Sequence, residues 1–368
     1  MIPVLVAGAA ARRALAPHGA GKVLAVFRRS IYLEREDGAL ACLGPPALGA
    51  GPLNALCGLP EGFDWEERGL APGAPFMCGE EAVRVAGGVS FSLRDARAWR
   101  ARLLPPDWGP ADLAGGLAAL ARTARPPAEG LRPPKGLWPP KEGMGRLIAE
   151  LILPPVRRRG EAPGSADLPS PAGVGFAEAG GYAGGSCLAP TDRQQGERSL
   201  FLHAARAGAL ALGEWLREAL RGEPSPPREE AGRLLGLGPG LTPSGDDFVG
   251  GAMVALRALG EGRAADRLAA WALPLAAERT GKISLAHLAC AAAGKGASAL
   301  HDALAALCAP GAPGLAEALA AVHAIGHTSG WDALAGAAGA CAARLSARGF
   351  GEGIRTRPGF EGRAPAPL

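Results

Sequence analysis

Hydrophobic and polar positions alternate in the first part of the chain, as is typical of β-strands. Residues 22–33 (KVLAVFRRSIYL) are rich in β-branched and aromatic residues, residues 34–38 have the composition of a turn, and residues 39–43 are apolar enough for a returning strand. Residues 82–93 (AVRVAGGVSFSL) alternate over most of their length around a Gly-Gly pair. We therefore predict a small antiparallel sheet or barrel within residues 1–104.

Leucine and alanine recur at helical spacing from Ser199 onward, in segments separated mostly by Gly or Pro. These segments are residues 199–221, 247–259, 264–277, 283–293, 297–307, 315–325 and 331–347. They predict a compact Ala/Leu-rich helical domain over residues 199–348. The fold class expected from both halves is α+β, with a small antiparallel β domain followed by a helical domain.

The stretch between these domains, residues 105–198, has the composition of a connector. Eleven of the 34 prolines lie in residues 121–171, which favours a semi-rigid path with one short helix around residues 144–153. Residues 173–188 are too rich in Gly for a regular helix and are expected to form a loop over a site. Residues 349–368 are expected to be an irregular tail.

Composition narrows the class of protein. Apolar residues make up 48% of the chain but aromatic residues only 5%, so the core must consist mostly of small aliphatic side chains, which suits closely packed helices. The net charge of +4 is mild, and the clearest basic run, Arg157 to Arg159, lies in the Pro-rich stretch. Nucleic-acid binders usually carry a basic stripe with interleaved aromatics, so we expect no nucleic-acid partner.

The seven cysteines are scattered and include no Cys-x-x-Cys pair, which argues against a disulfide framework or a zinc knuckle. Residues 1–15 are apolar, but their first positive charges, Arg12 and Arg13, follow the apolar run, which is the reverse of a secretory signal. No apolar run approaches the length of a membrane span. The sequence therefore predicts a cytoplasmic protein with no membrane partner.

A glycine-rich segment, residues 236–251 (GLGPGLTPSGDDFVGG), carries the most information about function. Its glycines allow positive φ angles and a close approach of a ligand to the backbone. The helix predicted to follow would present free N–H groups and the positive end of its dipole, which favour an anion. Asp246 and Asp247 would repel that anion unless a cation such as Mg²⁺ bridges them, or unless a carboxylate accepts a substrate amide N–H.

The pattern of serine, glycine and aspartate in this segment recurs near residue 330. The pattern Ser244-Gly245-x-Asp247-x-x-x-Gly251 matches Ser329-Gly330-x-Asp332-x-x-x-Gly336, and we predict that the two helix starts face one ligand. The alternative is purely structural, because Ser-x-x-Asp resembles a capping box and each later Gly allows close helix packing. A plain cap, however, needs neither three preceding glycines nor a second Asp.

Other motifs are weaker. His323 and His327 are spaced as two ligands on one helix face, but no third ligand at zinc-like spacing follows them. Residues 278–284 (ERTGKIS) offer Thr280 and Ser284 before a helix, either as a cap or beside an anionic substrate. The chain has no Gly-Lys-Ser/Thr of a P-loop and no Gly-x-Ser-x-Gly elbow. His18, His203, His287 and His301 are interpreted as structural or exposed.

The candidate residues follow from these patterns. The predicted catalytic residues are Asp246, Asp247, Asp332 and His327. The predicted substrate-binding residues are Gly238, Gly240, Thr242, Ser244, Gly245, Thr328, Ser329, Gly330, Thr280 and Ser284. The metal is unassigned, with Mg²⁺ as a candidate.

Two motifs of this sequence, LGLGPGLTPSGDD at residues 235–247 and GHTSGWDALAG at residues 326–336, resemble the AllH-type subunit family of oxamate carbamoyltransferase. VFRRSIYL at residues 26–33 and GPLN at residues 51–54 are also similar to that family. The glycine-loop motif is long and specific. The Pro-rich middle of the chain has no counterpart in the resemblance.

The resemblance implies a subunit of a multi-subunit carbamoyltransferase of anaerobic allantoin (purine) catabolism. In that pathway a carbamoyl group moves between oxamate and phosphate, and the expected partners are the other subunits and a small anion such as carbamoyl phosphate or oxamate. The alternative is a non-catalytic module that binds a small anionic metabolite. The paired aspartates favour chemistry, because a pure anion binder would avoid them. Neighbouring genes for a carbamate kinase and the other subunits would separate the two hypotheses.

Overall fold

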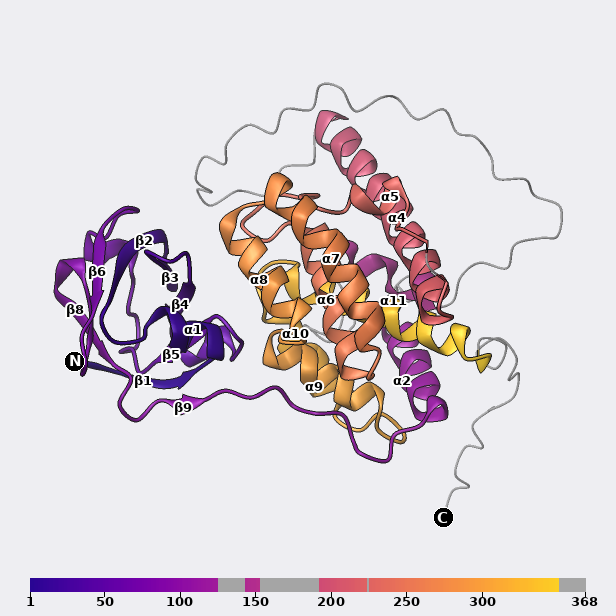
Figure 1. The fold of residues 1–368 in the computed structure, drawn as a ribbon, viewed down its shortest axis with the longest axis horizontal. Coiled ribbons are helices and arrows are strands. Elements are labelled where there is room, and N and C mark those ends of the chain that lie inside the picture. The colour runs from indigo at the N-terminus through magenta and orange to yellow at the C-terminus, as the bar shows by residue number, and fades with distance from the viewer. Residues whose placement is uncertain (125–142, 153–191, 224, 351–368) are drawn as a thin grey trace, which may run out of the picture.

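The computed structural model describes residues 1–124, 143–152, 192–223 and 225–350, which form a β-rich N-terminal domain beside a helical domain (Figure 1). This arrangement confirms the α+β class and the order of the two parts. The predicted loop at residues 173–188 and all but the first two residues of the predicted tail, residues 349–368, lie outside the described residues.

The β domain is a nine-stranded sheet that closes into a barrel, because β1 pairs with β5 as well as with β8. Short helices cross its connections: α1 (Ala9–Ala14), η1 (Pro46–Leu48), η2 (Glu66–Arg68) and η3 (Ala86–Gly88). The strands are β1 (Ile2–Ala7), β2 (Gly19–Phe27), β3 (Ser30–Arg35), β4 (Leu40–Gly44), β5 (Asn54–Cys57), β6 (Pro75–Cys78), β7 (Val83–Val85), β8 (Val89–Ser92) and β9 (Arg97–Ala98).

The prediction of a purely antiparallel domain is wrong. β1 is parallel to β8 and β9, and β4 is parallel to β5. The parallel β4–β5 pair arises because residues 45–53, which include η1, carry the chain back before β5 begins. Alternation of apolar and polar positions reports which face of a strand is buried, and it carries no information about strand direction.

The predicted strand over residues 22–33 is two strands. The chain turns at Arg28 and Arg29, so that Phe27 pairs with Ser30 in an antiparallel β2–β3 hairpin. The predicted return strand is confirmed as β4, and the predicted turn inside residues 82–93 is confirmed between β7 and β8.

The helical domain contains η4 (Met144–Leu147) and ten α-helices among the described residues of this part of the chain. The α-helices are α2 (Pro110–Thr123), α3 (Ile148–Ile152), α4 (Asp192–Leu220), α5 (Glu229–Gly232), α6 (Ser244–Ala258), α7 (Gly262–Arg279), α8 (Lys282–Ala292), α9 (Ser298–Leu307), α10 (Leu315–His323) and α11 (Ser329–Ala347). The short helix expected around residues 144–153 is present as η4 and α3.

Helices α6 and α11 lie at the centre of the helical domain, and 12 of the 15 residues of α6 and 13 of the 19 residues of α11 are buried. The stretch of residues 105–198 contributes to the same core, because Leu113, Leu117 and Leu120 of α2 and Met144 of η4 are fully buried in it. The stretch predicted as a connector therefore supplies apolar side chains to the domain that holds the predicted site.

The barrel contacts the helical domain mainly through α8, the helix nearest to it in Figure 1. Leu40 and Leu53 of the barrel are buried against Ile283 of α8. Beside them, Lys282 Nζ lies 2.5 Å from Oε1 of Glu34, a barrel residue that is itself buried. The start of α8 is thus fixed to the barrel by apolar packing and by an ion pair.

Within the part of the chain that the structure describes, no helix has the length and apolarity needed to cross a membrane.

Candidate functional site

The glycine-rich loop folds back onto the start of α6. Gly236, Gly238 and Gly240 all have positive φ angles. At Gly238 a side chain would lie 2.9 Å from the backbone nitrogen of Ser244, so the loop and helix start approach each other more closely than any other residue allows. The Gly245 N–H donates to the Leu237 carbonyl at 2.9 Å and locks the fold-back.

Asp246 holds this loop in place. Its Oδ1 accepts a hydrogen bond from the Gly236 N–H at 2.8 Å, and its Oδ2 accepts one from the Ser284 hydroxyl at 2.6 Å. The side chain therefore joins the loop, α6 and α8, and Ser284 is used in the same contact. These contacts give Asp246 a structural role, and its catalytic role stays a prediction.

The capping-box alternative is wrong for both copies of the repeated pattern. Helix α6 begins at Ser244 with Pro243 as its N-cap, and α11 begins at Ser329 with Thr328 as its N-cap. Neither N-cap has a side-chain hydrogen bond to the helix. The serines are therefore the first helical residues, and the aspartates lie one position beyond the place that a capping box requires.

The prediction that the two helix starts lie close together is confirmed. The Thr242 and Ser329 hydroxyl oxygens are 3.0 Å apart and share a hydrogen bond. The charge of Asp332 also contributes to raising the pKa of Asp247, which requires the two carboxyl groups to be near each other. Residues 87 positions apart in the chain thus form one polar cluster.

The later glycine of each copy lets the two helices approach each other. A side chain at Gly251 would lie 1.9 Å from the Ala333 carbonyl oxygen, and one at Gly336 would lie 1.8 Å from the Phe248 carbonyl oxygen. Each glycine thus meets the residue that follows the aspartate of the other copy. The packing role that the sequence left open for these glycines is confirmed, and its reciprocity brings Asp247 and Asp332 to matching positions.

Asp247 lies in an environment that disfavours its charge. Burial, followed by the charges of Asp332 and Asp246, raises the pKa of Asp247 well above its ordinary value, against the lowering effect of the Ser329 and Thr242 hydroxyls. Part of the residue stays accessible, yet its Oδ2 atom is buried and has no hydrogen-bond partner within the described ranges. The environment favours the protonated acid, which can donate a hydrogen bond and does not repel an anion.

Asp332 is fully buried, and the backbone of η4 holds its carboxyl group. Its Oδ1 accepts hydrogen bonds from the N–H groups of Met144 at 2.5 Å and Gly145 at 3.2 Å. Burial raises the pKa of Asp332 to about 6, although the Thr328 and Ser244 hydroxyls and these N–H groups lower it. Its Oδ2 has no hydrogen-bond partner among the described atoms.

The raised pKa of Asp332 predicts a pH-dependent stability. An unfolded aspartate titrates near 4, so the folded protein binds the proton more tightly, and its free energy of unfolding falls as pH rises from about 4 through about 6. Asp332→Asn keeps an oxygen acceptor but cannot ionise. We expect chemical denaturation to show this variant gaining up to about 3 kcal/mol relative to the wild type between pH 4 and pH 7. A difference that does not change with pH would contradict the burial of the charge.

The remaining predicted binding residues differ in their surroundings. The Thr280 hydroxyl, at the end of α7, is buried without a hydrogen-bond partner in the described part of the chain. Gly330 is packed so closely that a side chain would lie 2.0 Å from the Val322 carbonyl oxygen.

His327 lies exposed in the turn between α10 and α11, and His323 accepts a hydrogen bond from Trp331 Nε1 at 3.2 Å. His323 thus has a structural contact, and the role of His327 stays a prediction.

Among the described residues, no group of three or more His, Cys, Asp or Glu side chains is arranged to hold a metal ion. Burial raises the pKa of all six described cysteines, so their thiols stay protonated and are poor nucleophiles. The groups that the structure brings together at the helix starts include carboxyl and hydroxyl groups and backbone amides.

Two residues near the site were missed in the sequence. Tyr32 of β3 lies close enough to Asp247 for its pKa to be raised by that charge, although burial is the largest cause. His287 lies one helical turn after Ser284, and burial lowers its pKa to about 4, so its imidazole is neutral at physiological pH. Tyr32 belongs to a segment that carried the family resemblance, which was the available signal. A lone His on a helix gave no such signal.

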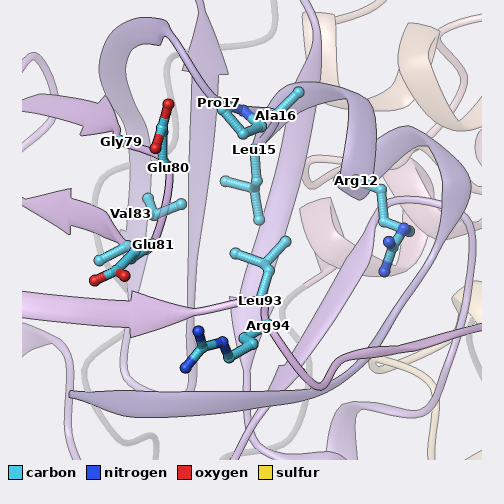
Figure 2. A pocket seen from close by; sticks show the side chains of 11 residues that line it. Arg12, Leu15, Ala16, Pro17, Gly79, Glu80, Glu81, Val83, Leu93 and Arg94 are labelled. Carbon is cyan, nitrogen blue, oxygen red and sulfur yellow. The ribbon is translucent and has the colours of Figure 1, made fainter.

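Two hollows lie elsewhere on the described surface. One, of about 350 Å³, lies on the barrel, where Figure 2 shows Leu15 and Leu93 with Glu80 and Glu81 on one side and Arg12 on the other. The second, of about 420 Å³, lies between α1, β4 and α8 and is lined mostly by alanine and other apolar residues. Neither is lined by a predicted site residue.

In the described part of the chain, a closed β-barrel lies beside a helical core in which the starts of α6 and α11 meet, so this is an α+β protein of two domains. The model of the oxamate carbamoyltransferase subunit AllH matches residues 234–341, and the model of the AllH family N-terminal domain matches residues 4–98. Together they cover more than half of the chain, which therefore belongs to the AllH family. The first match includes both helix starts, and the second includes all of the barrel strands except the first residues of β1. No curated protein and no solved structure matches the chain.

Proposed function

We propose that this chain is a subunit of a cytoplasmic carbamoyltransferase assembly and that the starts of α6 and α11 hold its small anionic substrate. The observation that carries the proposal is the convergence of two helix starts on Asp247 and Asp332, each with a buried, unpartnered carboxyl oxygen. Helix starts attract anions, and a buried polar atom without a partner in a native protein calls for an explanation. A bound substrate group supplies the missing partner.

Backbone amides around the loop are available for that anion. The N–H groups of Gly240, Leu241, Thr242 and Ser244 donate to no acceptor in the described part of the chain, whereas those of Gly245, Asp246 and Asp247 are already bonded. The anion site is therefore centred on the turn before α6, and the Thr242 and Ser329 hydroxyls lie at its edge. Fixed dipoles of this kind stabilise negative charge that develops in a transition state.

The carboxyl groups supply the proton that carbamoyl transfer requires. A hydrogenphosphate oxygen attacks the carbamoyl carbon of carbamoyl-oxamate and forms a C–O bond, while the C–N bond to the oxamate nitrogen breaks. That nitrogen gains a proton, and the hydrogenphosphate loses one. Protonated Asp247 donates the first proton and recovers the second, so that the step is balanced without a metal or a covalent intermediate. If Mg²⁺ bound here, Asp247 and Asp332 would be the residues to hold it, and its charge would neutralise the site in place of the proton.

The proposal predicts that the purified chain alone binds oxamate or carbamoyl phosphate but transfers little or no carbamoyl group between oxamate and phosphate. The reason is that the matching family is defined as one subunit of the enzyme, so part of the reaction site is expected to come from the other subunits. Mixing the chain with its partner subunits should restore turnover, which is measured as the release of oxamate.

Robust turnover by the isolated chain would show the assembly requirement to be wrong. Binding without turnover in any combination of subunits would instead favour the alternative, a non-catalytic module for a small anionic metabolite. Adding and chelating Mg²⁺ in the same assay separates the two ways of neutralising the site.

A further inference from the structure

Three neighbouring strands of the barrel carry a row of polar side chains. Tyr32 of β3 is directly opposite Cys42 of β4, and Cys42 is directly opposite Asn54 of β5. Directly opposed residues of paired strands point to the same face of the sheet. Tyr32, Cys42 and Asn54 therefore form one row, called here the polar row.

The polar row faces the helical domain. The residues that flank it, such as Ile31, Leu33, Ala41 and Leu43, belong to the barrel interior, so alternation along each strand turns the row outward. On that outer face Tyr32 packs with the cluster in which barrel leucines meet Ile283 of α8. Ile283 precedes Ser284, whose hydroxyl is bonded to Asp246. The barrel thus covers the helical domain at the point where α6 and α8 begin.

Tyr32, at one end of the row, lies near Asp247. The charge of Asp247 contributes to the raised pKa of Tyr32, and the Cys42 thiol is hydrogen-bonded to the Tyr32 phenol. Burial raises the pKa of Cys42 to about 11 and also raises that of Tyr32, so both groups stay neutral. Neutral hydroxyl and thiol groups are hydrogen-bonding groups rather than nucleophiles at physiological pH.

A solvent-shielded interface between two domains ordinarily favours apolar side chains, and the neighbours of Tyr32 in this interface are Leu, Ile and Ala. The ring of Tyr32 packs edge-to-face on Phe27, whereas its phenol is a polar group that this interface brings near Asp247. A phenol oxygen can accept a hydrogen bond from an amide NH₂ or donate one to an amide carbonyl. The phenol can donate to a carboxylate or phosphate oxygen as well, but only an amide NH₂ can also donate to its lone pairs, so the phenol favours an amide over these groups.

We propose that Tyr32, supported by Cys42, forms the barrel wall of the substrate site and selects substrates that carry a primary amide or carbamoyl group. This inference rests on the proposed function, because it assigns Tyr32 to the ligand held between α6 and α11. It makes the N-terminal domain a determinant of specificity in addition to a structural support.

The test compares oxamate with oxalate, in which a carboxylate replaces the amide. Isothermal titration calorimetry is performed with the full-length wild type, Tyr32→Phe and, as a control, Ser90→Ala, which removes a hydroxyl from β8. We expect Tyr32→Phe to weaken oxamate binding about tenfold, as the loss of one hydrogen bond does, and to weaken oxalate binding by a clearly smaller factor. Ser90→Ala should bind both anions like the wild type, and thermal melting checks that each variant is folded.

Equal weakening of oxamate and oxalate by Tyr32→Phe, or no change for either, would overturn the selection by Tyr32. Asp247→Asn distinguishes this failure from failure of the site itself. If Asp247→Asn impairs oxamate binding while Tyr32→Phe does not, the site at the helix starts stands and only the barrel wall is wrong. If the wild type binds neither oxamate nor carbamoyl phosphate, the proposed function and this inference both fail.

Discussion

Asp247→Asn is expected to lower carbamoyl transfer by the reconstituted assembly at least about 100-fold, since general acid–base catalysis contributes about that factor or more. The amide keeps the size of the carboxyl group and an oxygen acceptor, but it cannot deliver a proton. Because burial disfavours the charged carboxylate in the wild type, the variant should lose no more than about 1 kcal/mol of unfolding free energy. Initial rates and a denaturant titration on the same preparation measure both quantities.

Asp246→Asn is the matched control, because it makes the same chemical change one residue earlier. Asp246 accepts hydrogen bonds from Gly236 and Ser284, and Asn must present an NH₂ group to one of these donors. This variant should lose about 1–3 kcal/mol of stability, the cost of a broken buried hydrogen bond. Retained transfer activity in Asp247→Asn, or a stability loss as large as that of Asp246→Asn, would assign a structural role to Asp247.

Gly336→Ala should have the largest effect on stability. The new methyl carbon would lie 1.8 Å from the Phe248 carbonyl oxygen. The atoms that it meets all belong to the backbone of α6, so no side chain can rotate away to relieve the clash. Helices α6 and α11 must separate, so we expect a loss of about 3 kcal/mol of unfolding free energy in equilibrium urea denaturation, together with loss of oxamate binding.

Gly115→Ala in α2 serves as its control. Nothing lies within 4 Å of the added methyl group, and alanine favours helix, so this variant should gain about 0.5–1 kcal/mol. If Gly336→Ala were as stable as the wild type, the reciprocal contact between the two glycine-containing patterns would not hold the site together.

Periodicity predicted most of the helical domain because a helix that buries one face repeats its apolar residues every turn. The starts and ends of α9 and α11 lie within about two residues of their predicted positions. The strand pattern was less informative. It missed the turn at Arg28 and Arg29, since a tight hairpin between two apolar strands interrupts alternation for only two residues. It also could not reveal the parallel β4–β5 pair, because strand direction depends on the connection.

The repeated pattern around Asp247 and Asp332 predicted the convergence of the two helix starts, but the pattern alone did not separate caps from a site. The helix boundaries at Ser244 and at Ser329 rule out a capping box in both copies, and the role of the aspartates in a substrate site stays a proposal. Tyr32 could not be placed from sequence in physical terms, because its proximity to Asp247 depends on how the barrel packs on α8, a long-range contact that no local pattern encodes.

Hydrogen–deuterium exchange of the full chain, with and without oxamate and phosphate, tests most directly where the anion is held. The account predicts slower exchange in peptides that cover residues 236–247 and 328–332, where the amides before α6 and at the start of α11 meet the ligand, and in β3 around Tyr32. Slower exchange confined to residues 12–17 and 79–94, around the hollow on the barrel in Figure 2, would contradict it, as would ligand binding that leaves both helix starts unprotected.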